Sequence, residues 1–242
     1  MMNKKRIIRE AFIRSLPILC SYICVGTAYG MVMADAGYAW YDALFVSVAV
    51  YTGAFQFVFV TLLGSGATLL TIGLTALFMN SRQSFYALTF LDDFKAMGKK
   101  KLYMIHTMTD ETYAVNCALK LEAQESASYE HNDTIRHKEM FWIAFLSKGY
   151  WLVGAVLGAV IGQLLPFDFT GVDFCMTALF VIIFIDQWES AGSHVPALTG
   201  LIVAVLLLLI VGADYFLLPS LMVTSAFLMF WNARKEGRMH DA

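Results

Sequence analysis

The sequence predicts an all-α integral membrane protein, a polytopic helical bundle with about 7–8 membrane segments. Apolar residues make up 59% of the 242 residues and charged residues only 15%, and the mean hydropathy is +0.63. Ordinary soluble domains carry more charge. The apolar residues gather in runs of about 20, the length at which a helix crosses a bilayer core of about 30 Å. We expect one transmembrane domain over residues 1–242, embedded in the lipid bilayer.

The first span is expected at residues 15–34, after a basic N-terminus. A basic start followed by an apolar run is also typical of a signal peptide. This run lacks a convincing small-x-small cleavage site, so we interpret it as a retained span. Gly26 and Gly30 lie within it, and small residues allow a neighbouring membrane helix to approach closely.

The later segments follow in order along the chain. Residues 102–120 form a short, weakly apolar segment that either crosses the membrane or re-enters it. Residues 121–138 are polar and predict an exposed loop. The remaining spans are expected at 42–63, 139–164, 173–188, 196–213 and 215–232, and residues 67–91 form a further apolar region.

The basic residues predict the orientation in the membrane. They cluster before the first span, in KAMGKKK at 95–101 and in the C-terminal tail, whereas the connections at 35–41, 165–172 and 189–195 hold no Lys or Arg. Basic loops stay in the cytoplasm, so we expect both termini and the 95–101 segment there. For the region at 67–91, which precedes that segment, the charge rule favours a turn near NSRQ over a full crossing.

The polar segment NSRQ, Asn80 to Gln83, interrupts the apolar region at 67–91. An ionisable residue at membrane depth costs about 2.5–3.5 kcal/mol and is a functional candidate by default. Arg82 either snorkels toward the interface or faces a cavity from a broken helix, where a guanidinium binds a carboxylate through two hydrogen bonds. Four adjacent polar residues favour the broken helix. Arg82 and Asn80 are therefore predicted to bind substrate.

An internal repeat is a further hypothesis. Without a gap, residues 42–88 align with 173–219, so that Gln56 falls on Gln187 and NSRQ falls on VGAD, another polar break. Transporters are often built from such repeats, with the substrate site at broken helices between them.

Two other polar stretches supply candidate site residues. In YTGAFQF, Gly53 and Gln56 suit either a ligand or helix packing. In TDETYA, Thr109 is expected to cap a helix that begins at Asp110. Asp110 and Glu111 then either complement the helix dipole at an exposed end, or face a cavity where they take up protons or bind an ammonium group.

The stretch IDQWES carries the last candidates. Asp186 and Glu189 lie three residues apart, on one helical face, with Gln187 between them. Trp188 is equally typical of the interfacial end of a span. We take Asp186 as a proton-coupling candidate and Gln187 as a substrate-binding candidate, and Lys148 can pair with one of the carboxylates.

Soluble-enzyme motifs are absent from the sequence. No GxxxxGK[ST], HExxH or GxSxG occurs, which excludes ATP hydrolysis through a P-loop. The four cysteines sit in apolar stretches and indicate no metal site or disulfide framework. A net charge of −2 gives no indication of nucleic-acid binding. We therefore predict no enzyme activity and no cofactor.

Taken together, the motifs resemble the AzlC family, the large subunits of bacterial branched-chain amino acid exporters. The resemblance is carried, in order and over essentially the whole chain, by LPILCSYICVGTAYG, YTGAFQF, MNSRQSFYAL, TDETYA and TALFVIIFIDQW. Gln83 and Ser84 depart from the family, whose members often have a histidine and an apolar residue there. A histidine-based proton role is therefore not expected at this position.

The resemblance implies secondary export of Val, Leu and Ile, with Met as a further substrate, across the bacterial cytoplasmic membrane. It also implies a small hydrophobic AzlD-like partner subunit. Arg82 would hold the substrate carboxylate and an acidic residue its ammonium group, and without a nucleotide site the export would use an ion gradient. Two alternatives stay open: a membrane-embedded scaffold or regulatory subunit that transports nothing, and a transporter of another small zwitterion or of an ion.

Overall fold

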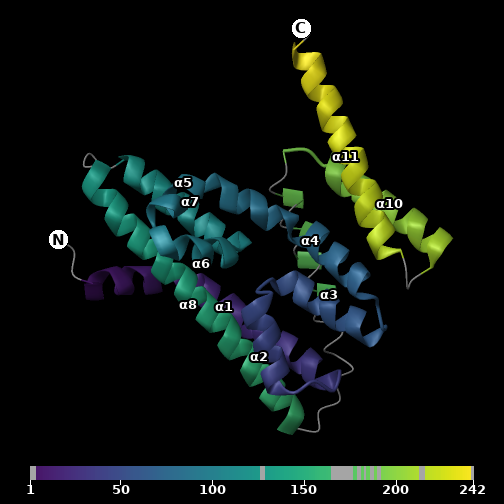
Figure 1. Ribbon diagram of the computed structural model, residues 1–242, viewed down its shortest axis with the longest axis horizontal. Helices are drawn as coiled ribbons and strands as arrows, with labels where there is room; N and C mark the ends of the chain where they lie inside the picture. The colour runs from purple at the N-terminus through teal and green to yellow at the C-terminus, as the bar shows by residue number, and fades with distance from the viewer. Residues whose placement is uncertain are drawn as a thin grey trace. The chain divides into compact units, whose positions relative to one another are not determined.

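The computed structural model describes residues 4–125, 129–164, 177–178, 181–182, 184–185, 188–189, 192–212 and 216–240. The regular elements in these ranges are helical, which confirms the predicted all-α class for the described part of the chain (Figure 1). The chain forms two units, Met1–Val60 with Asn80–Cys175 and Thr61–Met79 with Met176–Ala242. The single transmembrane domain and the internal repeat stay predictions.

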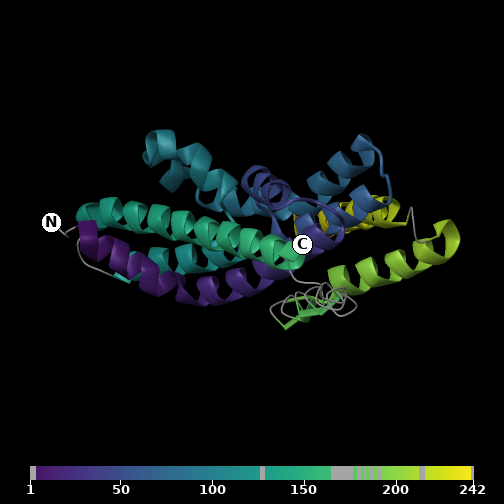
Figure 2. The same ribbon diagram turned by 90° about the horizontal axis from the view of Figure 1, so that it is seen from below.

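Two long helices, α1 (Lys4–Asp35) and α8 (Tyr129–Leu164), run side by side in the first unit (Figures 1 and 2). Glycines on both helices allow the backbones of α1 and α8 to approach each other closely. A Cβ atom at Gly30 would overlap the Ala155 carbonyl oxygen, and one at Gly158 would overlap the backbone of α1. The predicted close approach at Gly30 is therefore confirmed, through the small-residue contact typical of membrane helices.

Aromatic side chains surround this contact. The Trp151 ring of α8 lies 5.5 Å from the Tyr22 ring and 6.1 Å from the Tyr29 ring, measured between centroids. A Cβ atom at Gly26 would come within 3.1 Å of the Trp151 carbonyl oxygen. The second predicted glycine thus also lies at the contact between α1 and α8.

The span expected at 42–63 is divided into two helices, α2 (Trp40–Ala49) and α3 (Gly53–Gly64). The interruption falls at residues 50–52. Tyr51 there has a φ of +43°, a conformation that non-glycine residues adopt rarely. A broken helix of the expected kind does exist in this chain, at a different place from the predicted one.

The break predicted in the NSRQ segment is wrong, because α4 (Leu69–Thr89) runs through it without interruption. Neighbouring segments supply the polar partners instead. Arg82 Nη2 lies 3.2 Å from Asp110 Oδ2, and the Thr52 hydroxyl donates to Gln83 Oε1 at 3.5 Å. Arginine and glutamine are good helix formers, so the helix continues where its side chains find partners.

A second interruption separates α6 (Lys101–His106) from α7 (Asp110–Glu125). The segment expected over 102–120 is therefore not one helix. The short helix α5 (Leu91–Ala96) and the 3₁₀ turn η1 (Gly98–Lys100) come before α6 in the chain.

The loop predicted over 121–138 is corrected by the structure. Helix α7 continues to Glu125, and α8 already begins at Tyr129. Charged residues of this stretch have ionic partners: Arg136 is only 9% exposed and pairs with Asp93 of α5. The described polar residues of this stretch therefore belong to helices, and Arg136 anchors the start of α8 to α5.

Asp93 is the centre of an ionic cluster that joins α5, α7 and α8. Besides Arg136, it accepts a hydrogen bond from His137 Nε2 at 3.2 Å and pairs with Lys120 Nζ at 3.4 Å. The hydrogen bond from His137, with the charges of Arg136 and Lys120, outweighs the desolvation of burial and lowers the pKa of Asp93 to about 2. The cluster therefore favours an ionised Asp93.

The second unit contains α10 (Val195–Val211) and α11 (Leu217–His240), which contact each other. They correspond to the spans expected at 196–213 and 215–232. Most of the span expected at 173–188 lies outside the described residues.

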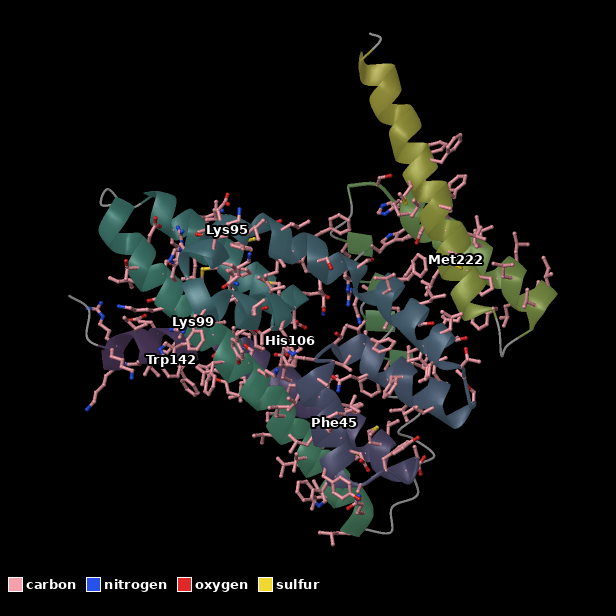
Figure 3. The ribbon with its side chains drawn as sticks, viewed as in Figure 1. Phe45, Lys95, Lys99, His106, Trp142 and Met222 are labelled. Atoms are coloured by element: carbon pink, nitrogen blue, oxygen red, sulfur yellow. The ribbon has the colours of Figure 1, made fainter. Side chains whose placement is uncertain are left out.

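Length and composition allow α1 and residues Asp133–Leu164 of α8 to cross a membrane. Apolar side chains also cover outer surfaces of shorter helices: Phe45 of α2 is 72% exposed and Met222 of α11 is 49% exposed (Figure 3). Extensive exposed apolar surface marks a membrane or protein contact. Four shorter apolar helices lie at Trp40–Ala49, Gly53–Gly64, Val195–Val211 and Pro219–Trp231. The number of spans, expected at about 7–8, stays a prediction.

Replacing Gly158 by alanine is expected to lower the free energy of unfolding by about 1–3 kcal/mol, because the added Cβ atom overlaps the Thr27 carbonyl. Gly149 is the matched control on the same helix, since a Cβ atom there meets nothing within 4 Å. Gly149→Ala should stabilise by up to about 1 kcal/mol through helix propensity. Thermal unfolding in detergent measures both, and equal midpoints for the two variants would contradict the close contact.

The Asp93 cluster predicts acid sensitivity. Because the pKa of Asp93 falls from 3.8 to about 2 on folding, the cluster contributes stability above about pH 4 that is lost as the pH falls toward 2, about 2 kcal/mol in all. Asp93→Asn should remove this pH dependence and lower the unfolding midpoint at neutral pH. Unfolding curves of both proteins across this pH range test it; parallel curves would show that Asp93 is not held ionised.

Candidate functional site

The two interruptions lie against each other in the first unit. His106, the last residue of α6, donates from Nε2 to the Val48 carbonyl oxygen, in the last turn of α2, at 3.1 Å. A carbonyl only accepts, so Nε2 carries the hydrogen. Irregular backbone at membrane depth is tolerated where it is buried in protein or lines a cavity. The interruptions are buried accordingly, with Tyr51 3%, Thr52 4% and Thr107 1% exposed.

The start of α7 at Asp110 is fixed by a reciprocal cap. The Thr109 N–H donates to Thr112 Oγ1 at 2.8 Å, and the Thr112 N–H donates to Thr109 Oγ1 at 3.4 Å. The predicted capping role of Thr109 is confirmed. The positive end of the α7 dipole therefore points into the junction of the two interruptions, and it carries two adjacent carboxylates.

The first carboxylate, Asp110, pairs with Arg82 of α4. Their side chains are 37% and 34% exposed, and Arg82 Nη2 lies 3.2 Å from Asp110 Oδ2. The pair is incomplete: within the described residues, Arg82 Nε and Asp110 Oδ1 are buried atoms that lack a hydrogen-bond partner. Two predicted site residues thus meet, with one donor and one acceptor left without a partner. Asn80 Oδ1 also lacks a partner among the described residues, but Asn80 lies two residues from Arg82 on a continuous helix and so faces another side of α4.

The second carboxylate, Glu111, faces α1. The Tyr22 hydroxyl, on a side chain only 6% exposed, donates to Glu111 Oε2 at 2.7 Å. The same hydroxyl oxygen lies 2.7 Å from Thr109 Oγ1. Glu111 is therefore hydrogen-bonded by a neutral group, whereas its neighbour Asp110 faces a cation.

Gln56 and Gly53 lie at the break between α2 and α3, and they support it. Gln56 is fully buried and donates from Nε2 to Ser47 Oγ at 3.0 Å, which ties α3 to α2 across the break. A Cβ atom at Gly53 would come within 3.0 Å of the Trp151 ring. Gln56 Oε1 is buried and lacks a partner among the described residues, so this acceptor is available for a ligand.

The remaining candidates are placed differently. Asp186 and Gln187 lie outside the described residues. Lys148 donates to the Val48 carbonyl at 3.2 Å, so its described partner is a backbone carbonyl and not a carboxylate. Tyr22 was not among the predicted site residues, because a tyrosine in an apolar span has no distinguishing pattern in sequence.

The arrangement suits binding of a small molecule that carries one positive and one negative charge. A guanidinium nitrogen, a helix N-terminus and carboxylate oxygens converge within one region. The stacked rings of Tyr86 and Tyr113, 4.6 Å apart, flank it on α4 and α7 and offer apolar surface. In the described part of the chain no group of His, Cys, Asp and Glu side chains could hold a metal ion.

Residues 17–165 match the family described as AzlC protein. The chain is 34% identical to the branched-chain amino acid transport protein AzlC of Bacillus subtilis, over 91% of this chain and 85% of that protein. It is 35% identical to an uncharacterized membrane protein of Helicobacter pylori strain 26695, over 94% and 96%, and 28% identical to the inner membrane protein YgaZ of Escherichia coli K12, over 92% and 91%. No solved structure matches.

Thr109→Ala is expected to lower the free energy of unfolding by about 1–2 kcal/mol, because it removes the cap of α7 and a hydrogen-bond partner of Tyr22. Thr109→Ser keeps the hydroxyl and is the matched control. Thermal unfolding in detergent measures the difference. A serine variant as unstable as the alanine variant would show that the methyl group and not the cap matters.

Proposed function

This chain belongs to the AzlC family, and from that premise we propose that it is the large subunit of a secondary exporter of branched-chain amino acids. The substrates are Val, Leu and Ile, with Met as a further candidate. The name of the Bacillus subtilis relative supports branched-chain amino acid transport. The direction of transport, the coupling and the partner are part of the proposal.

The observation that carries the proposal is the incomplete ion pair between Arg82 and Asp110. An amino acid brings a carboxylate and an ammonium group on one carbon atom. Its carboxylate would bind the Arg82 guanidinium, using the unpaired Nε, and its ammonium would bind Asp110 Oδ1. An ion pair this exposed contributes only about 0–1 kcal/mol, so a zwitterion can replace the internal partners at little cost.

The same region supplies the other contacts of such a substrate. Asn80 stays a proposed substrate-site residue, because its Oδ1 is a buried acceptor without a partner among the described residues. The Tyr86 and Tyr113 rings provide the apolar surface for a branched side chain. Gln56, Gly53 and Gln187 also remain proposed substrate-site residues, but the two charged contacts are assigned to Arg82 and Asp110.

Export against a gradient is proposed to use protons. Of the candidates Asp110, Glu111 and Asp186, we favour Glu111, because Tyr22 and not a cation is its hydrogen-bond partner in the described residues. Protonating Glu111 therefore leaves no cation unpaired, whereas protonating Asp110 would release Arg82. In this proposal Asp110 exchanges Arg82 for the substrate ammonium group when the substrate binds. Glu111 carries the proton.

The exposed apolar helices support assembly in a membrane with a partner. We propose the small hydrophobic AzlD-like subunit as that partner and the bacterial inner membrane as the location, with both termini in the cytoplasm. Transport by the large subunit alone is not required by this proposal.

Arg82→Gln is expected to lower leucine efflux from vesicles about 10- to 100-fold, the loss that follows removal of a charged hydrogen-bond donor. Arg14→Gln is the matched control, because Arg14 forms a pair with Glu122 at 2.6 Å that lies outside the proposed site. Purified protein is reconstituted with labelled leucine, with and without the small subunit, and both variants are checked for membrane insertion.

Each outcome of this experiment separates the alternatives. Normal efflux by Arg82→Gln removes Arg82 from the mechanism. A wild-type chain that binds the small subunit and moves no solute is a scaffold or regulatory subunit. Movement of another zwitterion or an ion in place of leucine keeps transport and changes the substrate.

A further inference from the structure

Lys148 occupies an unusual position inside the apolar part of α8. Its ammonium group donates to the Val48 carbonyl oxygen at 3.2 Å. It also lies 5.3 Å from the centroid of the Tyr51 ring and 5.8 Å from that of the Tyr103 ring. Among the described residues no carboxylate pairs with it. Lys148 is thus held by a carbonyl dipole and two aromatic faces.

These groups are ones that bind cations in general. Val48 belongs to the last turn of α2, where carbonyl groups lack partners within the helix and the helix dipole is negative. Aromatic faces attract cations within about 6 Å of the ring centroid. In transporters, the C-terminal ends of interrupted helices coordinate coupling cations in this way. The second donor to the Val48 carbonyl, His106, lies at the rim of the same site.

We propose that the end of α2, with Tyr51 and Tyr103, forms a site for a monovalent ammonium-type cation, and that Lys148 is its tethered occupant. The covalent tether replaces a free cation, so the break between α2 and α3 is held together without sodium or potassium in the medium. The site is distinct from the Arg82–Asp110 pair and does not depend on which solute is transported.

A neutral side chain at position 148 should leave the site open to a free cation. Lys148→Met, purified as the full chain in detergent, is expected to unfold at a lower temperature than wild type in N-methylglucamine chloride, whose cation is much bulkier than a lysine ammonium group. Methylammonium chloride at about ten times its Kd should then raise the unfolding midpoint by about 3 °C. Wild type should not respond to methylammonium.

Two controls make this result specific. Lys95→Met removes an exposed lysine that pairs with Asp92 at 3.2 Å and should not create a methylammonium response. Lys148→Met combined with Tyr103→Leu should respond less than Lys148→Met alone, because one aromatic face is lost. An equal response of all the proteins, or no response of Lys148→Met, overturns the proposal.

A second variant covers the case in which Lys148→Met does not fold. Lys148→Cys is made in a chain whose other cysteines, Cys20, Cys24, Cys117 and Cys175, are replaced. Treatment in membranes with an aminoethyl methanethiosulfonate restores an ammonium group, and the methyl reagent gives a neutral adduct. Folded protein should be recovered after extraction only with the charged adduct. Equal recovery of both adducts, or recovery of neither, contradicts the tethered cation.

Discussion

The close contact between α1 and α8 is the constraint on which the rest of the first unit depends. Glycines at 30 and 158 remove the side chains that would hold these helices apart. As a result Tyr22 on α1, and Trp151 and Lys148 on α8, reach the same interruptions in neighbouring helices. Membrane helices gain no hydrophobic driving force from one another, so such contacts carry their association.

The two interruptions turn this contact into a site. Each places a helix end inside the unit: the C-terminal end of α2 offers carbonyl oxygens, and the N-terminal end of α7 offers a positive dipole and two carboxylates. At the first end the Lys148 ammonium and the His106 Nε2–H share the Val48 carbonyl. At the second end Arg82 meets Asp110. The helix ends of this unit therefore hold groups of both signs of charge.

Composition and apolar runs were sufficient to predict the all-α class, and charge at membrane depth was sufficient to single out Arg82 and Asp110. Their meeting was not predicted, because contact between residues 82 and 110 depends on the placement of α4 beside α7. The break was assigned to NSRQ, since polar residues suggest unwinding, whereas it lies at Tyr51, whose neighbours are apolar or small. Partners on adjacent helices decide whether a polar segment stays helical, and a single sequence does not contain them.

The Arg82–Asp110 pair is proposed to bind both charged groups of an amino acid. Equilibrium binding of three small molecules to the purified chain tests it most directly: L-leucine, 4-methylpentanoate, which lacks the ammonium group, and 3-methylbutylamine, which lacks the carboxylate. We expect each truncated molecule to bind at least about 10-fold more weakly than leucine, because it leaves either Arg82 or Asp110 without a charged partner from the ligand. Binding of either truncated molecule as tightly as leucine would contradict the account.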